Sequence, residues 1–124
     1  VDGVIVFGGN DKTVRAIHAS NGSSVWIAKV RGRVSSTPVV AKGTDGSGSS
    51  LHPVTLTESG DVVCLGRNSG LPRWQMSLKQ SAAASVSPSI SRAANVVVAG
   101  GTRGEVVGWD GATGEERFRI RLDG

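Results

Sequence analysis

Three glycines in this chain each stand four residues before an aromatic side chain. The pairs are Gly22 with Trp26, Gly70 with Trp74, and Gly114 with Phe118. Successive glycines are 48 and then 44 residues apart, and the aromatic residues keep the same intervals. A repeat period in the forties, built from short apolar runs, is typical of propeller blades and argues against one compact core. The repeat therefore predicts a structural role for these glycines and aromatics before a functional one.

Short runs rich in Val and Ile alternate with Gly, Asn, Asp and Ser, which is the pattern of an all-β chain. These turn residues tolerate the positive φ angles that hairpins need. Residues 79–85 are rich in alanine and have a weak helical preference, but they lie between two strand-like runs and are predicted as a loop. The predicted strands are 4–8, 13–18, 23–30, 34–40, 53–57, 61–66, 72–78, 86–91, 95–99, 105–110 and 115–121.

Two prolines repeat at a second position of the unit. Pro38 follows Trp26 by 12 residues, and Pro88 follows Trp74 by 14. Because proline has no backbone N–H, each is predicted to mark a strand start or an edge strand. The segment 41–52 makes the middle unit longer, and its small, polar residues predict a mobile surface loop.

The whole unit resembles the PQQ-like repeat of the quinoprotein β-propeller superfamily, a WD40-like architecture. The resemblance rests on three motif copies: 16–19 through Gly22 to Trp26, 64–66 through Gly70 to Trp74, and 109–114 through to Phe118. The aspartate usual in this motif is present as Asp110 in the third copy, and His18 replaces it in the first. In that family the tryptophan packs onto the neighbouring blade. The resemblance therefore implies a structural docking motif made here of Gly22, Trp26, Gly70, Trp74, Asp110, Gly114 and Phe118.

The predicted fold is all-β: a PQQ-like β-propeller fragment of about three four-stranded antiparallel blades. Residues 1–124 form one partial propeller. Blade 1 is partial and spans 1–33, blade 2 spans 34–83 with the inserted loop 41–52, and blade 3 spans 84–124. A closed ring needs roughly 4 to 8 blades, so we expect further sequence, or several copies, to complete it.

The charge pattern predicts a solvated surface. The chain carries a net charge of +4, and its densest basic runs, 29–33 and 117–121, alternate with other residues. On a strand this spacing places the charges on one face. A nucleic-acid interface is disfavoured because no aromatic side chains interleave for base stacking. No apolar stretch approaches 18 residues, so no membrane span is expected.

No catalytic, cofactor-binding or metal-ligating set is predicted. The histidines, His18 and His52, lie in different units and lack the flanking signature of a catalytic triad. Residues 8–13 lack the glycine before lysine that a phosphate-binding loop requires. Residues 10–11 and Asp45 are predicted as turn residues, because no alternating carboxylate loop surrounds them.

The single cysteine also limits the chemistry. Cys64 excludes an internal disulfide and a cysteine zinc site, and it is predicted as a small buried hydrophobe. Catalytic members of the resembled family hold the quinone cofactor and calcium on the propeller axis, with a dedicated Asp base, a Glu/Asn calcium set and often a vicinal disulfide. None of those residues can be mapped onto this chain, so no cofactor is expected.

The favoured function is a non-catalytic propeller segment acting as a scaffold or protein-interaction module of a larger protein. Two alternatives stay open. One is the C-terminal propeller region of an adenylating, acyl-CoA synthetase-like (β-alanine-activating) enzyme, and the other is a fragment of a PQQ-dependent dehydrogenase. Any activity is expected elsewhere in the full-length protein. The expected partners are the remaining blades or other protein domains, with no membrane or nucleic-acid contact. The adenylating alternative implies the cytoplasm, and a bacterial quinoprotein-like identity implies the periplasm.

Overall fold

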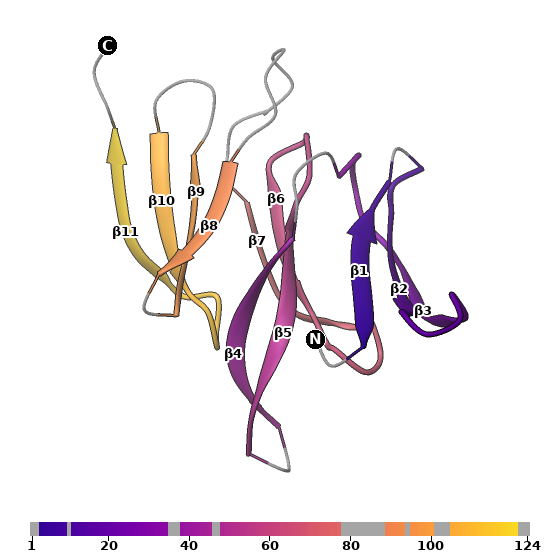
Figure 1. The fold of residues 1–124 in the computed structure, drawn as a ribbon. Helices are drawn as coiled ribbons and strands as arrows, with labels where there is room; N and C mark the ends of the chain where they lie inside the picture. Colours follow the sequence, from indigo (N-terminus) through magenta and orange to yellow (C-terminus); the bar gives the residue numbers. More distant parts are fainter. Residues whose placement is uncertain are drawn as a thin grey trace.

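The computed structural model describes residues 3–9, 11–34, 38–45, 48–77, 89–93, 95–100 and 105–121. Within these residues, eleven strands form three antiparallel sheets that stand side by side (Figure 1). The predicted all-β fold is confirmed. Each sheet is made of strands that follow one another in the chain, because short turns connect neighbouring antiparallel strands.

The sheets are named here in chain order. The first sheet contains β1 (Val4–Gly8), β2 (Thr13–His18) and β3 (Ser24–Lys29). The second contains β4 (Val39–Asp45), β5 (Gly48–Leu56), β6 (Asp61–Leu65) and β7 (Pro72–Ser77). The third contains β8 (Ser89–Ala93), β9 (Val96–Gly100), β10 (Glu105–Asp110) and β11 (Glu116–Arg121).

The position of a strand in this stack explains its sequence pattern. In β2, Val14 and Ala16 are fully buried while Arg15 between them is exposed, the period of two expected when one face is covered. In β6, the four residues 62–65 are all buried. The middle sheet has a neighbour on each face, so β6 reads as a continuous apolar run.

Two hydrophobic cores fill the spaces between the sheets. The core between the first and second sheets consists of Val14, Ala16, Trp26, Ala28, Val34, Val63 and Leu65. The core between the second and third consists of Ala41, Val54, Leu56, Val62, Cys64, Trp74, Val97, Ala99, Val107 and Trp109. The strand β6 contributes alternate residues to both cores, so it ties the stack together.

The predicted loop at 41–52 was wrong for the residues that the structure describes. Residues 41–45 and 48–52 belong to β4 and β5, which pair from Val39 opposite Val54 out to Asp45 opposite Gly48. The extra length therefore extends a hairpin, visible as the long β4–β5 ribbon in Figure 1. Backbone hydrogen bonds can hold two such strands together even where the side chains are small. The small, polar composition of this segment therefore did not distinguish a paired hairpin from a loop.

Other sequence predictions on boundaries are only partly covered by the described residues. The predicted strand 34–40 begins later, as β4 at Val39, while Val34 forms an isolated bridge with Thr57. The predicted loop 79–85 and Pro88 lie outside the described residues. The division into blades at 33/34 and 83/84 stays a prediction.

Candidate functional site: aromatic–glycine contacts between sheets

Trp26 crosses from the first sheet to the second. It lies on β3 opposite Ala16, next to a register shift in the β2–β3 pairing, and its side chain is only 7% exposed. A methyl group placed on Gly70 would lie 2.7 Å from the Trp26 ring, so the indole rests directly on that glycine. The indole Nε1 donates a hydrogen bond to the carbonyl oxygen of Arg67 at 2.9 Å. The ring thus contacts the turn between β6 and β7 by packing and by one polar bond.

Trp74 repeats this geometry between the second and third sheets. It lies on β7 opposite Cys64, again beside a register shift, and is 6% exposed. A methyl group on Gly114 would lie 2.7 Å from its ring, and Nε1 donates to the carbonyl oxygen of Gly111 at 3.0 Å. Two independent copies of one contact therefore join three sheets.

The three glycine turns share one backbone conformation. The φ angles of Gly22, Gly70 and Gly114 are 74°, 73° and 78°, in the left-handed region that glycine adopts at no steric cost. Each glycine N–H also donates to a carbonyl four residues earlier, at 2.7–2.8 Å. Gly22 differs in its surroundings, because a methyl group there would meet no described atom within 4 Å. The first turn therefore has the same backbone conformation as the two turns that contact a tryptophan, but no described aromatic side chain lies on it.

Phe118 stands where the tryptophans stand in the other sheets. It lies opposite Gly108 on β10 and packs on that glycine within its own sheet. Its side chain is 39% exposed, whereas the two tryptophans are buried. Among the described residues, Phe118 therefore reaches no neighbouring sheet.

Asp110 stabilises the turn that carries Gly114. Its Oδ1 accepts hydrogen bonds from the backbone N–H groups of Ala112 at 2.9 Å and Thr113 at 3.3 Å, and its Oδ2 accepts from Arg117 at 3.0 Å. The first two turns lack this carboxylate. The sequence thus grouped glycines, aromatics and Asp110 that the structure places at three related turns, and their role as a docking motif stays a prediction.

The residue that precedes each glycine was predicted as part of a turn, but its side-chain hydrogen bond was not. The side-chain oxygens of Asn21, Ser69 and Thr113 each accept a hydrogen bond from the backbone N–H two residues later, at 2.9–3.2 Å. This is the local turn that Asn, Ser and Thr form with their own backbone. The signal was present, because all three copies carry such a residue directly before the glycine.

Asn95 is a second missed contact, and it joins the second and third sheets. Its Oδ1 accepts from the backbone N–H of Lys42 at 2.7 Å, and its Nδ2 donates to the Lys42 carbonyl oxygen at 3.1 Å. The carbonyl oxygen of Asn95 accepts a hydrogen bond from the backbone N–H of Gly111. The carbonyl oxygen of Gly111 in turn accepts the hydrogen bond from Trp74 Nε1. Asn95 has a φ of 57°, which asparagine tolerates better than most residues.

Replacing Asn95 should therefore destabilise the protein in two separable ways. Asn95→Gly removes both amide bonds but keeps the backbone conformation, and we expect a loss of about 1–2 kcal/mol of unfolding free energy. Asn95→Ala should cost about 1 kcal/mol more, because alanine is strained at positive φ. Urea unfolding of both variants measures this. Equal stability of Asn95→Gly and the unchanged protein would contradict the inter-sheet role.

The residue types that could act in catalysis or metal binding do not cluster among the described residues. His18 is exposed on the first sheet, while His52 is buried in the second and its Nδ1 accepts from the backbone N–H of Arg67 at 3.2 Å. The hydrogen bond from the Thr13 hydroxyl, and then that from Arg15, lowers the pKa of Asp11 in its turn. Over the described part of the chain, no three His, Cys, Asp or Glu residues gather as a metal site. The described residues also contain no helix long and apolar enough to cross a membrane.

Burial makes the thiol of Cys64 inert. It raises the pKa of Cys64 from its ordinary 9.0 to about 12, with Arg73 opposing the shift more weakly. We expect no alkylation of the folded protein by iodoacetamide at pH 8, and rapid alkylation in urea.

The same shift predicts a loss of stability in alkali. Above pH 9 the unfolded thiol ionises while the folded one stays protonated, so unfolding is favoured by about 1.4 kcal/mol per pH unit up to about pH 12. A Cys64→Val variant should lack this part of the pH dependence. If both proteins lose stability equally between pH 9 and 11, the thiol is not responsible.

Stacked antiparallel sheets, joined by a recurrent tryptophan on a glycine turn, define this chain as part of a β-propeller of PQQ-like repeats. A family model described as outer membrane protein assembly factor BamB matches residues 58–124, more than half of the sequence. The chain belongs to that family. A search of curated proteins found no match to the sequence.

Solved structures share the fold at low sequence identity. BamB from Moraxella catarrhalis is similar with a TM-score of 0.75 and 22% identity, over 97% of this chain and 34% of that one. A europium-containing methanol dehydrogenase has a TM-score of 0.77 and 16% identity, over 100% of this chain and 24% of that one. Sqt1 of Saccharomyces cerevisiae has a TM-score of 0.70 and 16% identity, over 94% and 31%. The chain therefore spans about a third or less of these proteins.

Proposed function

We propose that the chain is a non-catalytic PQQ-like propeller segment that acts as a scaffold or protein-interaction module of a larger protein. The open turn at Gly22 carries this proposal. At Gly70 and Gly114 the same turn holds a tryptophan from the neighbouring sheet, whereas at Gly22, which has nearly the same φ, a methyl group would meet no described atom within 4 Å. By this comparison, the first sheet is built to receive an aromatic side chain from a further sheet.

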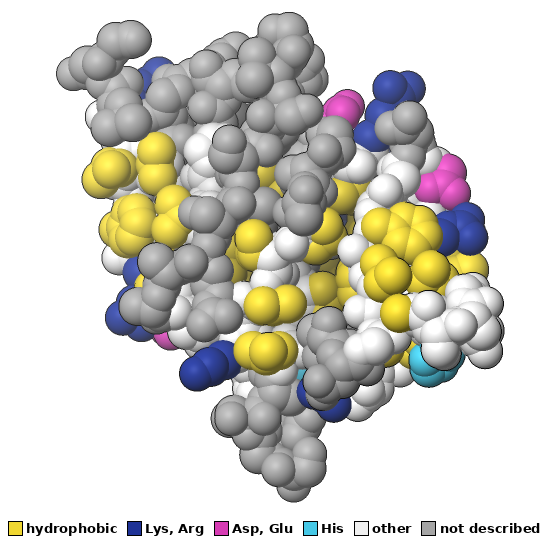
Figure 2. Space-filling model, viewed as in Figure 1, with side chains coloured by type: hydrophobic (Ala, Val, Ile, Leu, Met, Phe, Trp, Pro, Cys, Tyr) yellow, Lys and Arg dark blue, Asp and Glu magenta, His cyan; other side chains and the backbone are white. Residues whose placement is uncertain are grey.

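The outer faces of the stack support the same proposal. On the first sheet, Phe7 lies opposite Arg15 and Arg15 opposite Ile27, so Phe7 and Ile27 share one face. On the third sheet, Phe118 and Ile120 share a face of β11, and all four apolar side chains are at least 39% exposed. Figure 2 shows hydrophobic side chains gathered over both ends of the stack. Exposed apolar patches of this kind mark contact surfaces.

The docking motif is part of this proposal. Trp26 and Trp74 fix the position of neighbouring sheets by packing on Gly70 and Gly114. Phe118, the third aromatic residue of the motif, is exposed and available to contact a glycine turn of a further sheet. The partners are remaining blades of the same protein or other protein domains. Membership of the BamB family supports protein contact in general. No described residue favours the adenylating-enzyme or dehydrogenase alternatives.

Sedimentation velocity tests the contact role of the outer face. We expect the chain to self-associate with rising concentration, and Ile27→Lys to weaken that association by placing a charge on the face. The matched control is Leu71→Lys, because Leu71 is 67% exposed but lies in the connection between β6 and β7, away from the outer face of the first sheet. A monomeric chain that unfolds in one sharp transition would contradict the proposal.

Calorimetric titration with PQQ and calcium tests the non-catalytic part. The proposal predicts no saturable heat. Saturable binding of the cofactor would instead favour the dehydrogenase alternative.

A further inference from the structure

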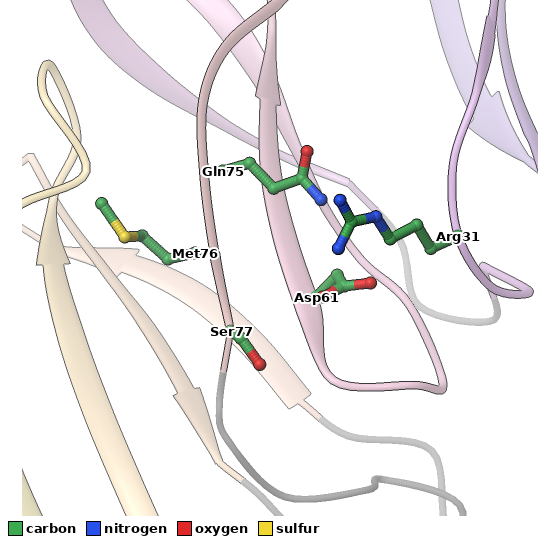
Figure 3. A pocket seen from close by; sticks show the side chains of 5 residues that line it. All are labelled: Arg31, Asp61, Gln75, Met76 and Ser77. Carbon is green, nitrogen blue, oxygen red and sulfur yellow. The ribbon is translucent and has the colours of Figure 1, made fainter.

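The strand β6 begins beside a polar groove and ends beside a buried histidine. The groove has a volume of about 390 Å³, and Figure 3 shows the five side chains that line it, Arg31, Asp61, Gln75, Met76 and Ser77. All five are exposed or half-buried, so the ionisable groups there stay in contact with water. Just beyond the other end of β6, His52 is only 3% exposed. A change of charge therefore costs little at the groove and much at His52.

Two hydrogen bonds meet on the backbone of Arg67, in the connection that follows β6. The N–H of Arg67 donates to Nδ1 of His52 at 3.2 Å. The carbonyl oxygen of Arg67 accepts from Nε1 of Trp26 at 2.9 Å. One residue thus joins the buried histidine of the second sheet to the tryptophan that the first sheet places on Gly70.

The contact between the second and third sheets has the same arrangement with a different acceptor. There Gly111 takes the place of Arg67, because its carbonyl oxygen accepts from Nε1 of Trp74 at 3.0 Å. The N–H of Gly111, however, donates to the backbone carbonyl oxygen of Asn95 at 2.8 Å. A peptide carbonyl does not titrate between pH 5 and 8, whereas a histidine ring does. The two tryptophan contacts therefore differ in whether protons can act on them.

The bond from Arg67 requires the neutral form of His52. Nδ1 accepts a hydrogen bond only while it carries no proton, because both ring nitrogens of a charged histidine are donors. A proton on Nδ1 would point at the N–H of Arg67, and the bond would be lost. A buried N–H without an acceptor is itself unfavourable.

A cation lies near the same ring. A methyl group on Gly43 would be 3.0 Å from Cδ2 of His52 and 3.1 Å from Nη2 of Arg73, so both side chains lie over this glycine of β4. The guanidinium disfavours a second positive charge beside it. Elements around His52 carry three further titratable groups: Lys42 on β4, which is exposed, Cys64 on β6, whose pKa is raised to about 12, and Asp110 on the third sheet, which accepts from its own turn and from Arg117.

We propose that His52 makes the contact between the first and second sheets sensitive to acid, while the contact between the second and third is not. A histidine ring ordinarily takes up a proton near pH 6.5. In His52 that proton removes the bond to Arg67 and adds repulsion from Arg73, so the carbonyl acceptor of Trp26 is no longer held from β5. The stabilisation by neutral His52 is present above this range and is lost as the pH falls, because the unfolded chain binds the proton more readily.

The indole N–H signals of the unchanged chain test this proposal by nuclear magnetic resonance. The chain has three tryptophans, and Trp26→Phe and Trp74→Phe assign the two signals of interest. Between about pH 7.5 and 5 we expect the Trp26 signal to shift with a single midpoint. The Trp74 signal is the internal control and should stay in place. Equal movement of the two signals would overturn the proposal.

Two histidine variants locate the effect. His52→Asn keeps a side-chain oxygen that can accept from Arg67 but takes up no proton in this range. It should abolish the acid shift of Trp26, whereas His18→Asn, at an exposed histidine of the first sheet, should retain it.

Urea unfolding at several pH values gives a second measurement. For the unchanged protein and for His18→Asn, the unfolding equilibrium constant should rise by up to roughly tenfold per pH unit below about pH 6. His52→Asn should lack this rise, whatever its stability at neutral pH. The same rise in His52→Asn, or greater stability of the unchanged protein in acid, would overturn the proposal. The second result would mean that the folded protein holds His52 in its charged form.

Discussion

Replacing Trp74 by alanine should lower the free energy of unfolding by about 3–5 kcal/mol, the usual cost of deleting a buried indole. The side chain is 6% exposed and fills the space between the second and third sheets, where it rests on Gly114. The substitution would leave a cavity in the core between these two sheets, which Trp74 shares with Trp109. Urea unfolding followed by far-ultraviolet circular dichroism measures the loss.

A conservative variant separates packing from hydrogen bonding. Trp74→Phe keeps a ring on Gly114 but removes the Nε1 bond to the Gly111 carbonyl oxygen. We expect it to cost about 1–2 kcal/mol, clearly less than alanine. If Trp74→Ala costs less than 1 kcal/mol, the indole does not hold the sheets together.

The repeat in the sequence predicted local structure well because its signals are local. Strand alternation and glycine turns depend on residues within one unit, so β1, β2 and β10 have the predicted bounds. The same reasoning linked Gly70 and Gly114 to aromatic residues. It could not say that Trp26 meets Gly70, which is a contact between two units.

Contacts between distant residues account for what the sequence did not predict. Asn95 binds the backbone of Lys42, 53 residues earlier, and no local pattern encodes that pair. Gly43 was interpreted as flexible, yet a methyl group there would meet the ring of His52 at 3.0 Å. Its small size serves close packing within a hairpin. A glycine therefore needs its spatial neighbours before its role can be assigned.

Gly70→Ala should be clearly more destabilising than Gly22→Ala, although the two glycines have nearly the same φ. Alanine at positive φ costs about 1–2 kcal/mol at either position. At Gly70 the added methyl group would also lie 2.7 Å from the Trp26 ring, whereas at Gly22 it meets no described atom. Displacing a buried ring costs about 1–3 kcal/mol more.

The difference in unfolding free energy between the two variants therefore measures the contact with Trp26, because the backbone strain of alanine at positive φ is the same in both. The unfolding free energies of the two alanine variants should differ by about 1–3 kcal/mol in the chain as it stands. In a form where a further sheet covers the first turn, Gly22→Ala should become as costly as Gly70→Ala, because the new methyl group would then meet an aromatic ring. Equal costs in the monomer would mean that the Trp26 contact adds nothing beyond the strain of the turn. Comparing the monomer with the assembled form thus reports directly whether Gly22 receives an aromatic side chain.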